Sequence, residues 1–157
     1  MERGFTLIEL MVVIAVVAIL AMVALPGIQG KLVSDQVVEA MRLADIAKAP
    51  IAAAWARSHS LPAGNAEAGL PPPERVVSNL VGALAVEAGA IHVTFGNRAR
   101  AVLVGKTLSL RPAVIADAPV VPIAWVCGYA PVPRPMTVEG ANRTDLPTAL
   151  LPLNCRP

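Results

Sequence analysis

The sequence predicts an α+β protein in which a long N-terminal helix packs on a four-stranded antiparallel sheet. Three observations predict this fold class. An apolar run from Phe5 to Leu25 is interrupted by one charge, an amphipathic pattern follows from Lys31 to Arg57, and short apolar segments alternate with glycine and proline turns beyond residue 60. The first two patterns are typical of a helix, and the third is typical of short strands joined by tight turns.

The apolar run is long enough to cross a bilayer as a helix, since the hydrocarbon core needs about 20 apolar residues. An ordinary secretory signal places its cleavage site after the apolar region, but no small-x-small site with a polar mature start follows Leu25. We therefore expect the run to stay with the protein. The carboxylate of Glu9 is costly at bilayer depth and is by default a functional candidate. Thr6 and Glu9 also have the spacing of a capping box, so a local role at the helix start is a second interpretation.

Beyond Leu25, the sequence predicts a loosening or kink at Pro26, Gly27 and Gly30, after which the helix resumes and ends by Ser58. Its apolar residues recur at three- and four-residue steps, which predicts one buried stripe packed on the protein's own sheet. The residues of this stripe are Val33, Val37, Ala40, Met41, Ala44, Ala47, Ile51 and Trp55.

A loop and a four-stranded meander are predicted for the rest of the chain. Residues 60–80 contain prolines and glycines and are typical of a surface loop. The predicted strands are Ala90–Phe95, Ala101–Val104, Thr107–Arg111 and Ile123–Cys127.

Cys127 and Cys155 are the only cysteines, and they lie in the last part of a chain whose N-terminus indicates export. Oxidising compartments favour a disulfide between such a pair. The alternatives are a metal pair or two free thiols. A zinc site has few ligands to draw on, because His59 and His92 stand alone and no Cys-x-x-Cys spacing is present. We predict no metal site and no cofactor.

The composition gives little support for an enzyme or a nucleic-acid binder. Apolar residues make up 55% of the 157 residues, charged residues 15%, and the net charge is +2. The histidines have no serine or cysteine partner at a recognisable spacing, so no catalytic residue is predicted. A basic strip on or beside the second and third strands is an alternative that favours phosphate or DNA binding, although surface solubility explains it equally well. Its members are Arg98, Arg100, Lys106 and Arg111.

The string Gly4-Phe5-Thr6-Leu7-Ile8-Glu9 with its apolar helix resembles the class III signal of type IV pilins and pseudopilins. Three further strings resemble those of type IVa pilins: residues 65–70 in the loop after the helix, residues 125–128 at a strand end, and residues 146–156 near the C-terminus. These extend the resemblance over most of the chain and argue against a pseudopilin.

The resemblance implies processing and assembly. It implies a leader peptide of residues 1–4, cleaved after Gly4 by a prepilin peptidase that also methylates the new N-terminus, Phe5. It implies a hydrophobic transmembrane and assembly helix over residues 5–30, and a periplasmic or extracellular globular domain over residues 31–157. Glu9 would pair with the Phe5 ammonium of a neighbouring subunit, where two buried charges neutralise each other.

The function implied is that of a structural subunit of a type IV pilus. The precursor would wait in the inner membrane and then enter a helical homo-oligomeric filament on the cell surface, through an assembly platform and a separate motor. Filaments of this family support adhesion, twitching motility or DNA uptake. The alternatives are a minor pilin that acts as a DNA receptor and a pseudopilin of a type II secretion system.

Overall fold

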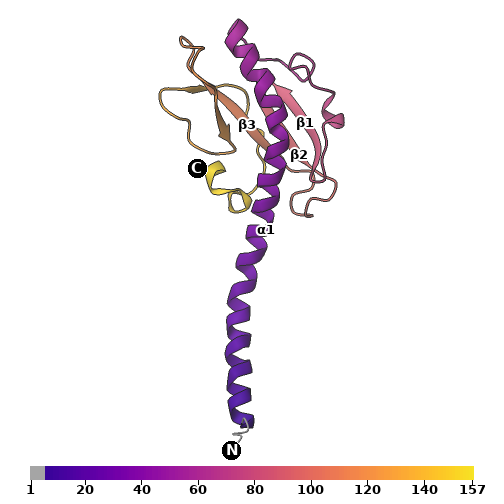
Figure 1. Ribbon diagram of the computed structural model, residues 1–157, viewed down its shortest axis with the longest axis vertical. Helices are drawn as coiled ribbons and strands as arrows, with labels where there is room; N and C mark the ends of the chain where they lie inside the picture. Colours follow the sequence, from indigo (N-terminus) through magenta and orange to yellow (C-terminus); the bar gives the residue numbers. More distant parts are fainter. Residues whose placement is uncertain (1–5) are drawn as a thin grey trace, which may run out of the picture. The chain divides into compact units, whose positions relative to one another are not determined.

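The structure is a computed structural model that describes residues 6–157, apart from the side chains of residues 24–29. The first element is the helix α1, Leu7–Ser58 (Figure 1). The chain forms two compact units, one up to residue 32 and one from residue 33 to residue 157. The kink predicted at Pro26 and Gly27 falls on residues whose side chains lie outside the described part. The predicted boundary between an assembly helix ending at residue 30 and a globular domain starting at residue 31 stays a prediction.

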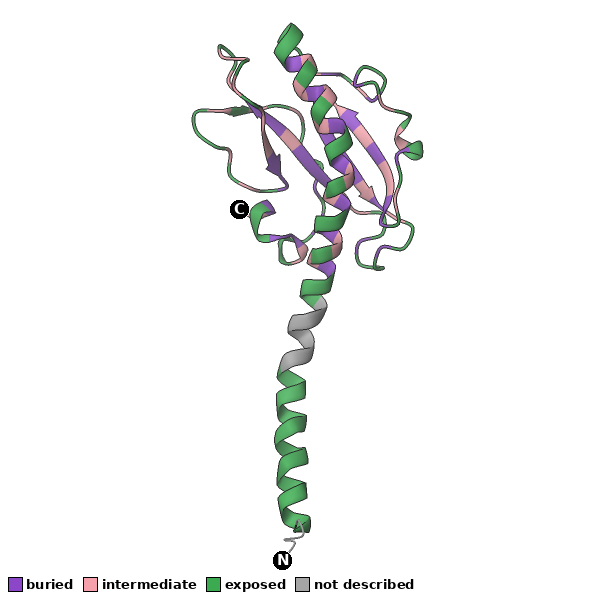
Figure 2. Cartoon of the chain, in the orientation of Figure 1, coloured by how far each residue is buried: buried purple, intermediate pink, exposed green. Residues whose placement is uncertain are grey.

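The described apolar side chains of α1 in the first unit are exposed. Every side chain described from residue 6 to residue 23 is exposed in the single chain (Figure 2). In the described residues, no helix combines the length and the apolarity that crossing a membrane requires.

In the second unit, α1 buries one stripe against the sheet. The stripe is the predicted one, with Val37, Ala44 and Ile51 fully buried and Met41 partly buried. Its alanines, Ala40, Ala44 and Ala47, are buried in the same core as the strands. The helix ends at Ser58 as predicted, and His59 follows in a left-handed conformation with φ 53°.

The sheet has four strands in sequence order plus a short fifth. The order β1-β2-β3-β4 is antiparallel throughout, and β5 pairs with β3 beyond the end of β2. The strands are β1 (Val81–Glu87), β2 (Ala90–Phe95), β3 (Thr107–Val114), β4 (Ala124–Cys127) and β5 (Thr137–Val138). The connections include the 3-10 turns η1 (Pro73–Arg75), η2 (Thr148–Leu150) and η3 (Leu153–Cys155).

The sequence prediction was wrong about one strand and missed another. Residues 101–104 form turns, in which the Leu103 N–H donates to Arg100 O at 2.7 Å. Only Leu103 points into the core, while Val102 and Val104 are about half exposed, so four consecutive apolar residues do not make a strand here. The missing strand is β1, whose small residues give a weak alternating pattern.

The two faces of the sheet differ in polarity. Side chains alternate between faces along a strand. On β2, Ile91, Val93 and Phe95 belong to the core that α1 covers. His92 and Thr94 therefore face the other way, and His92 is nevertheless buried. The segment after β5 covers this second, polar face.

Candidate assembly site and C-terminal segment

The processing residues predicted at the N-terminus lie mostly outside the described residues. Gly4 and Phe5 are both outside them. Thr6 and Glu9 are described, and the Glu9 N–H donates to Thr6 Oγ1 at 3.3 Å. This is one of the two hydrogen bonds of a capping box, so the cap interpretation of the Thr6–Glu9 spacing is supported. Pairing of the Glu9 carboxylate with another subunit remains a prediction.

The exposed stretch of α1 after Glu9 is an apolar surface on all sides. Its large side chains are between half and three-quarters exposed. They include Leu10, Met11, Val12, Val13, Ile14, Val16, Val17, Ile19, Leu20, Met22 and Val23. A helix that is apolar all round belongs in a protein core or in a membrane. This surface therefore needs cover from outside its own chain.

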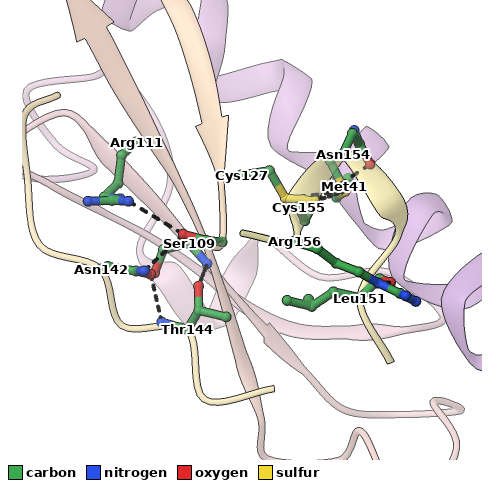
Figure 3. The surroundings of a disulfide bond; sticks show 11 residues. Met41, Ser109, Arg111, Cys127, Asn142, Thr144, Leu151, Asn154, Cys155 and Arg156 are labelled. Atoms are coloured by element: carbon green, nitrogen blue, oxygen red, sulfur yellow. Dashed lines mark hydrogen bonds between the residues drawn. A yellow bond between two sulfur atoms is a disulfide. The ribbon is translucent and has the colours of Figure 1, made fainter. Parts of the chain in front are cut away.

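The predicted disulfide is present between Cys127 and Cys155, with an S–S distance of 2.00 Å (Figure 3). It joins the end of β4 to η3. The Sδ atom of Met41 lies 3.9 Å from both cysteine sulfurs, which places the disulfide against α1. The alternatives of a metal pair and of two free thiols are excluded, because both sulfurs are in the disulfide. In the described part of the chain, no group of three or more metal-binding side chains occurs.

Gly128 follows Cys127 at a position where a residue with a side chain does not fit. Its φ is +55°, and a Cβ atom there would lie 2.9 Å from the carbonyl oxygen of Cys155. The next residue, Tyr129, donates its N–H to the same oxygen at 2.9 Å. A glycine is required because the chain must turn sharply at close range to η3.

Residues 142–145, which we name the C-terminal strap, run along the edge of β3 beyond the end of β4. The Ser109 N–H donates to Thr144 Oγ1 at 3.0 Å, and the Asp145 N–H donates to Thr107 O at 3.2 Å. The Thr107 N–H in turn donates to Asp145 Oδ1 at 2.6 Å. The strap thus satisfies backbone groups of β3 that β4 is too short to reach.

A polar cluster, in which His92 and Ser109 are buried and Glu87 and Arg143 are partly exposed, fastens the strap to the sheet. His92 Nδ1 lies 2.9 Å from Ser109 Oγ, which also accepts the Arg143 N–H at 2.8 Å. Arg143 Nη2 is 2.6 Å from Glu87 Oε2, and His92 Nε2 is 4.0 Å from the same oxygen. Burial lowers the pKa of His92, as does Arg143, while Glu87 opposes the shift. The sequence reasoning missed this cluster, because four of its residues come from separate segments.

Asn65, within the string that resembles type IVa pilins, covers the free edge of β1. Its side-chain oxygen accepts the Val86 N–H at 2.6 Å, and its Nδ2 donates to Leu84 O at 2.9 Å and to Pro71 O at 2.8 Å. The amide group thus makes the two bonds that a neighbouring strand would make.

The predicted basic strip is divided among different environments. Lys106 Nζ lies 3.6 Å from Asp145 Oδ2, and Arg111 is partly buried with Nη2 3.4 Å from Gly128 O. Arg98 and Arg100 are exposed in the turn after β2. Because two of the four cations are already engaged, the strip gives weaker support to phosphate binding than the sequence suggested.

Comparison with known proteins finds matches to a family and to an N-terminal motif. The family described as pilin (bacterial filament) matches residues 36–156, and the prokaryotic N-terminal methylation motif matches residues 1–25. This chain belongs to the pilin family. The long helix, the antiparallel sheet and the C-terminal disulfide of this pilin agree with that membership.

The curated relatives of this pilin extend over nearly its full length. It is 34% identical over 163 residues to a type IV major pilin protein, PilE1, of Neisseria gonorrhoeae, covering 99% of this chain and 88% of that one. It is 33% identical over 166 residues to a fimbrial protein of Neisseria meningitidis serogroup A, covering 99% and 95%. It is 34% identical over 114 residues to the fimbrial protein EcpC of Eikenella corrodens, covering 71% and 74%.

Proposed function

We propose that this pilin is the structural subunit of a type IV pilus and that it polymerises through the N-terminal part of α1. The observation that carries the proposal is the apolar surface of residues 7–23, which is exposed in the single chain. Such a surface needs lipid before assembly and other helices after it. Relatives named as major pilins and fimbrial proteins support the structural subunit over the minor-pilin and pseudopilin alternatives.

Processing precedes assembly in this proposal. A prepilin peptidase cleaves after Gly4 and methylates the amine of Phe5, in line with the methylation motif that matches residues 1–25. The precursor is held in the inner membrane by its apolar helix, with residues 31–157 outside the cytoplasm. An assembly platform and a motor transfer it into the extracellular filament, where it serves adhesion, twitching motility or DNA uptake. The fold and the family favour a non-enzymatic role.

Glu9 sets the position of each subunit along the filament. Its carboxylate pairs with the Phe5 ammonium of a neighbouring copy, because an unpaired charge among packed apolar helices is strongly unfavourable. The hydrogen bond from the Glu9 N–H to Thr6 Oγ1 is compatible with this pairing, since it uses the backbone and leaves the carboxylate available.

The test separates the two roles of Glu9 in a cell that has a type IV pilus system but lacks its own major pilin. We expect Glu9→Ala to be cleaved and inserted normally, while the yield of sheared filaments falls at least about tenfold, because each unpaired ammonium is left buried. Thr6→Ala removes the cap alone, which is worth about 1 kcal/mol, and should assemble better than Glu9→Ala. Glu139→Ala, in an exposed position, is the matched control. Normal filament yield from Glu9→Ala would refute the pairing.

A further inference from the structure

The His92 cluster links three strands and the C-terminal strap on the side of the sheet away from α1. His92 is 3% exposed and lies on β2, Ser109 lies next to it on β3, and Glu87 ends β1. From the strap, Arg143 contacts both Ser109 and Glu87. Glu87 and Arg143 are the charged groups that act on His92. Farther along the same face, Arg111 contacts the carbonyl of Gly128, and at the far end of the strap Asp145 pairs with Lys106.

The geometry assigns one tautomer to neutral His92. A proton on Nε2 faces the Glu87 carboxylate, whereas a lone pair there would face the same negative oxygen at 4.0 Å. With the proton on Nε2, Nδ1 is an acceptor and receives the hydroxyl hydrogen of Ser109 at 2.9 Å. Ser109 Oγ then remains free to accept the Arg143 N–H at 2.8 Å. In this tautomer the Ser109 hydroxyl and the Arg143 N–H each have a partner, whereas the hydrogen on Nε2 has no partner within hydrogen-bond distance.

Protonation of His92 breaks this arrangement at the serine. Nδ1 becomes a donor directed at Ser109 Oγ, so the hydroxyl hydrogen of Ser109 loses its acceptor in a buried position. An unsatisfied buried donor is costly, and the new charge also lies close to the Arg143 guanidinium. Attraction to Glu87 opposes these effects and outweighs the repulsion by Arg143, but burial of the ring is the largest influence and lowers the pKa of His92.

We propose that His92, Ser109 and Glu87 form a proton-sensitive clamp that holds the C-terminal strap to β3 and loosens it on acidification. The strap is the part that opens, because Asn142, Arg143 and Asp145 are exposed whereas β2 and β3 have strand neighbours on both sides. The disulfide closes the loop that contains the strap, so the opening stays local. An open strap uncovers the edge of β3 at Thr107 and Ser109, which can pair with another strand. This clamp does not depend on polymerisation.

The direction with pH follows from the histidine. Because the pKa of His92 in the folded chain lies below the ordinary value of about 6.5, the unfolded or open form takes up protons first. The stability supplied by the clamp is therefore complete above about pH 6.5 and decreases as the pH falls below that value.

The test uses NMR on the full chain in detergent micelles to follow both the His92 ring and the backbone amides of the strap. The ring signals of His92 are followed against pH, and amide exchange is converted into protection factors, which removes the intrinsic effect of pH. Between pH 7.5 and 5.0, we expect the protection of the Arg143 and Asp145 amides to fall at least about threefold, in step with the protonation of His92. The amides of β2 should keep their protection.

The matched variants are His92→Gln, which cannot be protonated but offers an acceptor to Ser109, and His59→Gln. The fall in protection should disappear in His92→Gln and persist in His59→Gln. Unchanged protection across the titration of His92, a parallel loss in β2, or an equal fall in His92→Gln would each overturn the clamp. If His92→Gln does not fold, the clamp is still tested by whether strap protection follows His92 protonation in the unchanged chain.

Discussion

Asn65 acts in place of a neighbouring strand at the open edge of the sheet. Edge strands present free backbone groups that invite pairing with other chains. On β1, the Val86 N–H and the Leu84 carbonyl are these groups, and the Asn65 amide binds both. One residue therefore both fixes the loop that follows α1 and protects the sheet edge, which explains in physical terms why this loop carries an asparagine there.

At this scale we predict that Asn65→Ala lowers the free energy of unfolding by about 2–3 kcal/mol, because it leaves a buried N–H and a buried carbonyl without partners. Denaturant unfolding of the full chain in detergent measures the change. Asn79→Ala, at an exposed position, is the control and should stay within about 0.5 kcal/mol of the unchanged chain. Equal effects of the two variants would show that the Asn65 contacts contribute nothing specific.

At the scale of elements, buried alanines form much of the surface that α1 packs against the core. Ala40, Ala44 and Ala47 are each no more than 1% exposed, and all three belong to the core that includes the strands. Next to Ala47, Lys48 Nζ pairs with Asp45 at 2.8 Å and lies 5.9 Å from the ring centroid of Trp125 on β4.

We therefore expect Ala44→Leu to destabilise the second unit by about 1–3 kcal/mol, because the added atoms have no room between helix and sheet. Ala49→Leu places the same side chain on the exposed side of the helix and should have little effect. Thermal unfolding of both variants, followed by circular dichroism, provides the comparison. If Ala44→Leu unfolds at the same temperature as the unchanged chain, the close packing inferred for α1 is wrong.

The disulfide is the second stabilising element. It closes a loop between residues 28 apart, and the chain-entropy model predicts a contribution of about 3.5 kcal/mol for a loop of that length. We expect the double variant Cys127→Ser, Cys155→Ser to lose about that much stability in denaturant unfolding. A reducing agent added to the unchanged chain should produce a similar loss, and a change of less than about 1 kcal/mol in both would contradict a structural role.

Elements differ in how far the sequence predicts them. The stripe of α1 was predicted residue by residue, because charged residues separate its apolar positions at the helical period. Strand β1 was missed because Gly82, Ala83 and Ala85 weaken its alternation. Residues 101–104 were wrongly predicted to be a strand, because an apolar run does not by itself require strand pairing. The strap and the His92 cluster arise only from tertiary contacts between distant segments, so no local pattern predicted them.

At the scale of the whole molecule, the two units have different requirements. Residues 33–157 contain a core, a satisfied sheet edge and a disulfide. Residues 7–23 have exposed apolar side chains in the single chain. The second unit therefore has what a stable fold needs, and polymerisation through the first unit remains the proposal.

Polymerisation through a retained N-terminal helix is tested most directly by mass spectrometry of filaments sheared from the surface of cells that produce this pilin. We expect the chain to be the dominant species and to begin with N-methylated Phe5. A filament chain that begins beyond Pro26 would lack the assembly helix and would contradict this role of the helix. Filaments in which this chain is only a trace component would contradict its role as the main structural subunit.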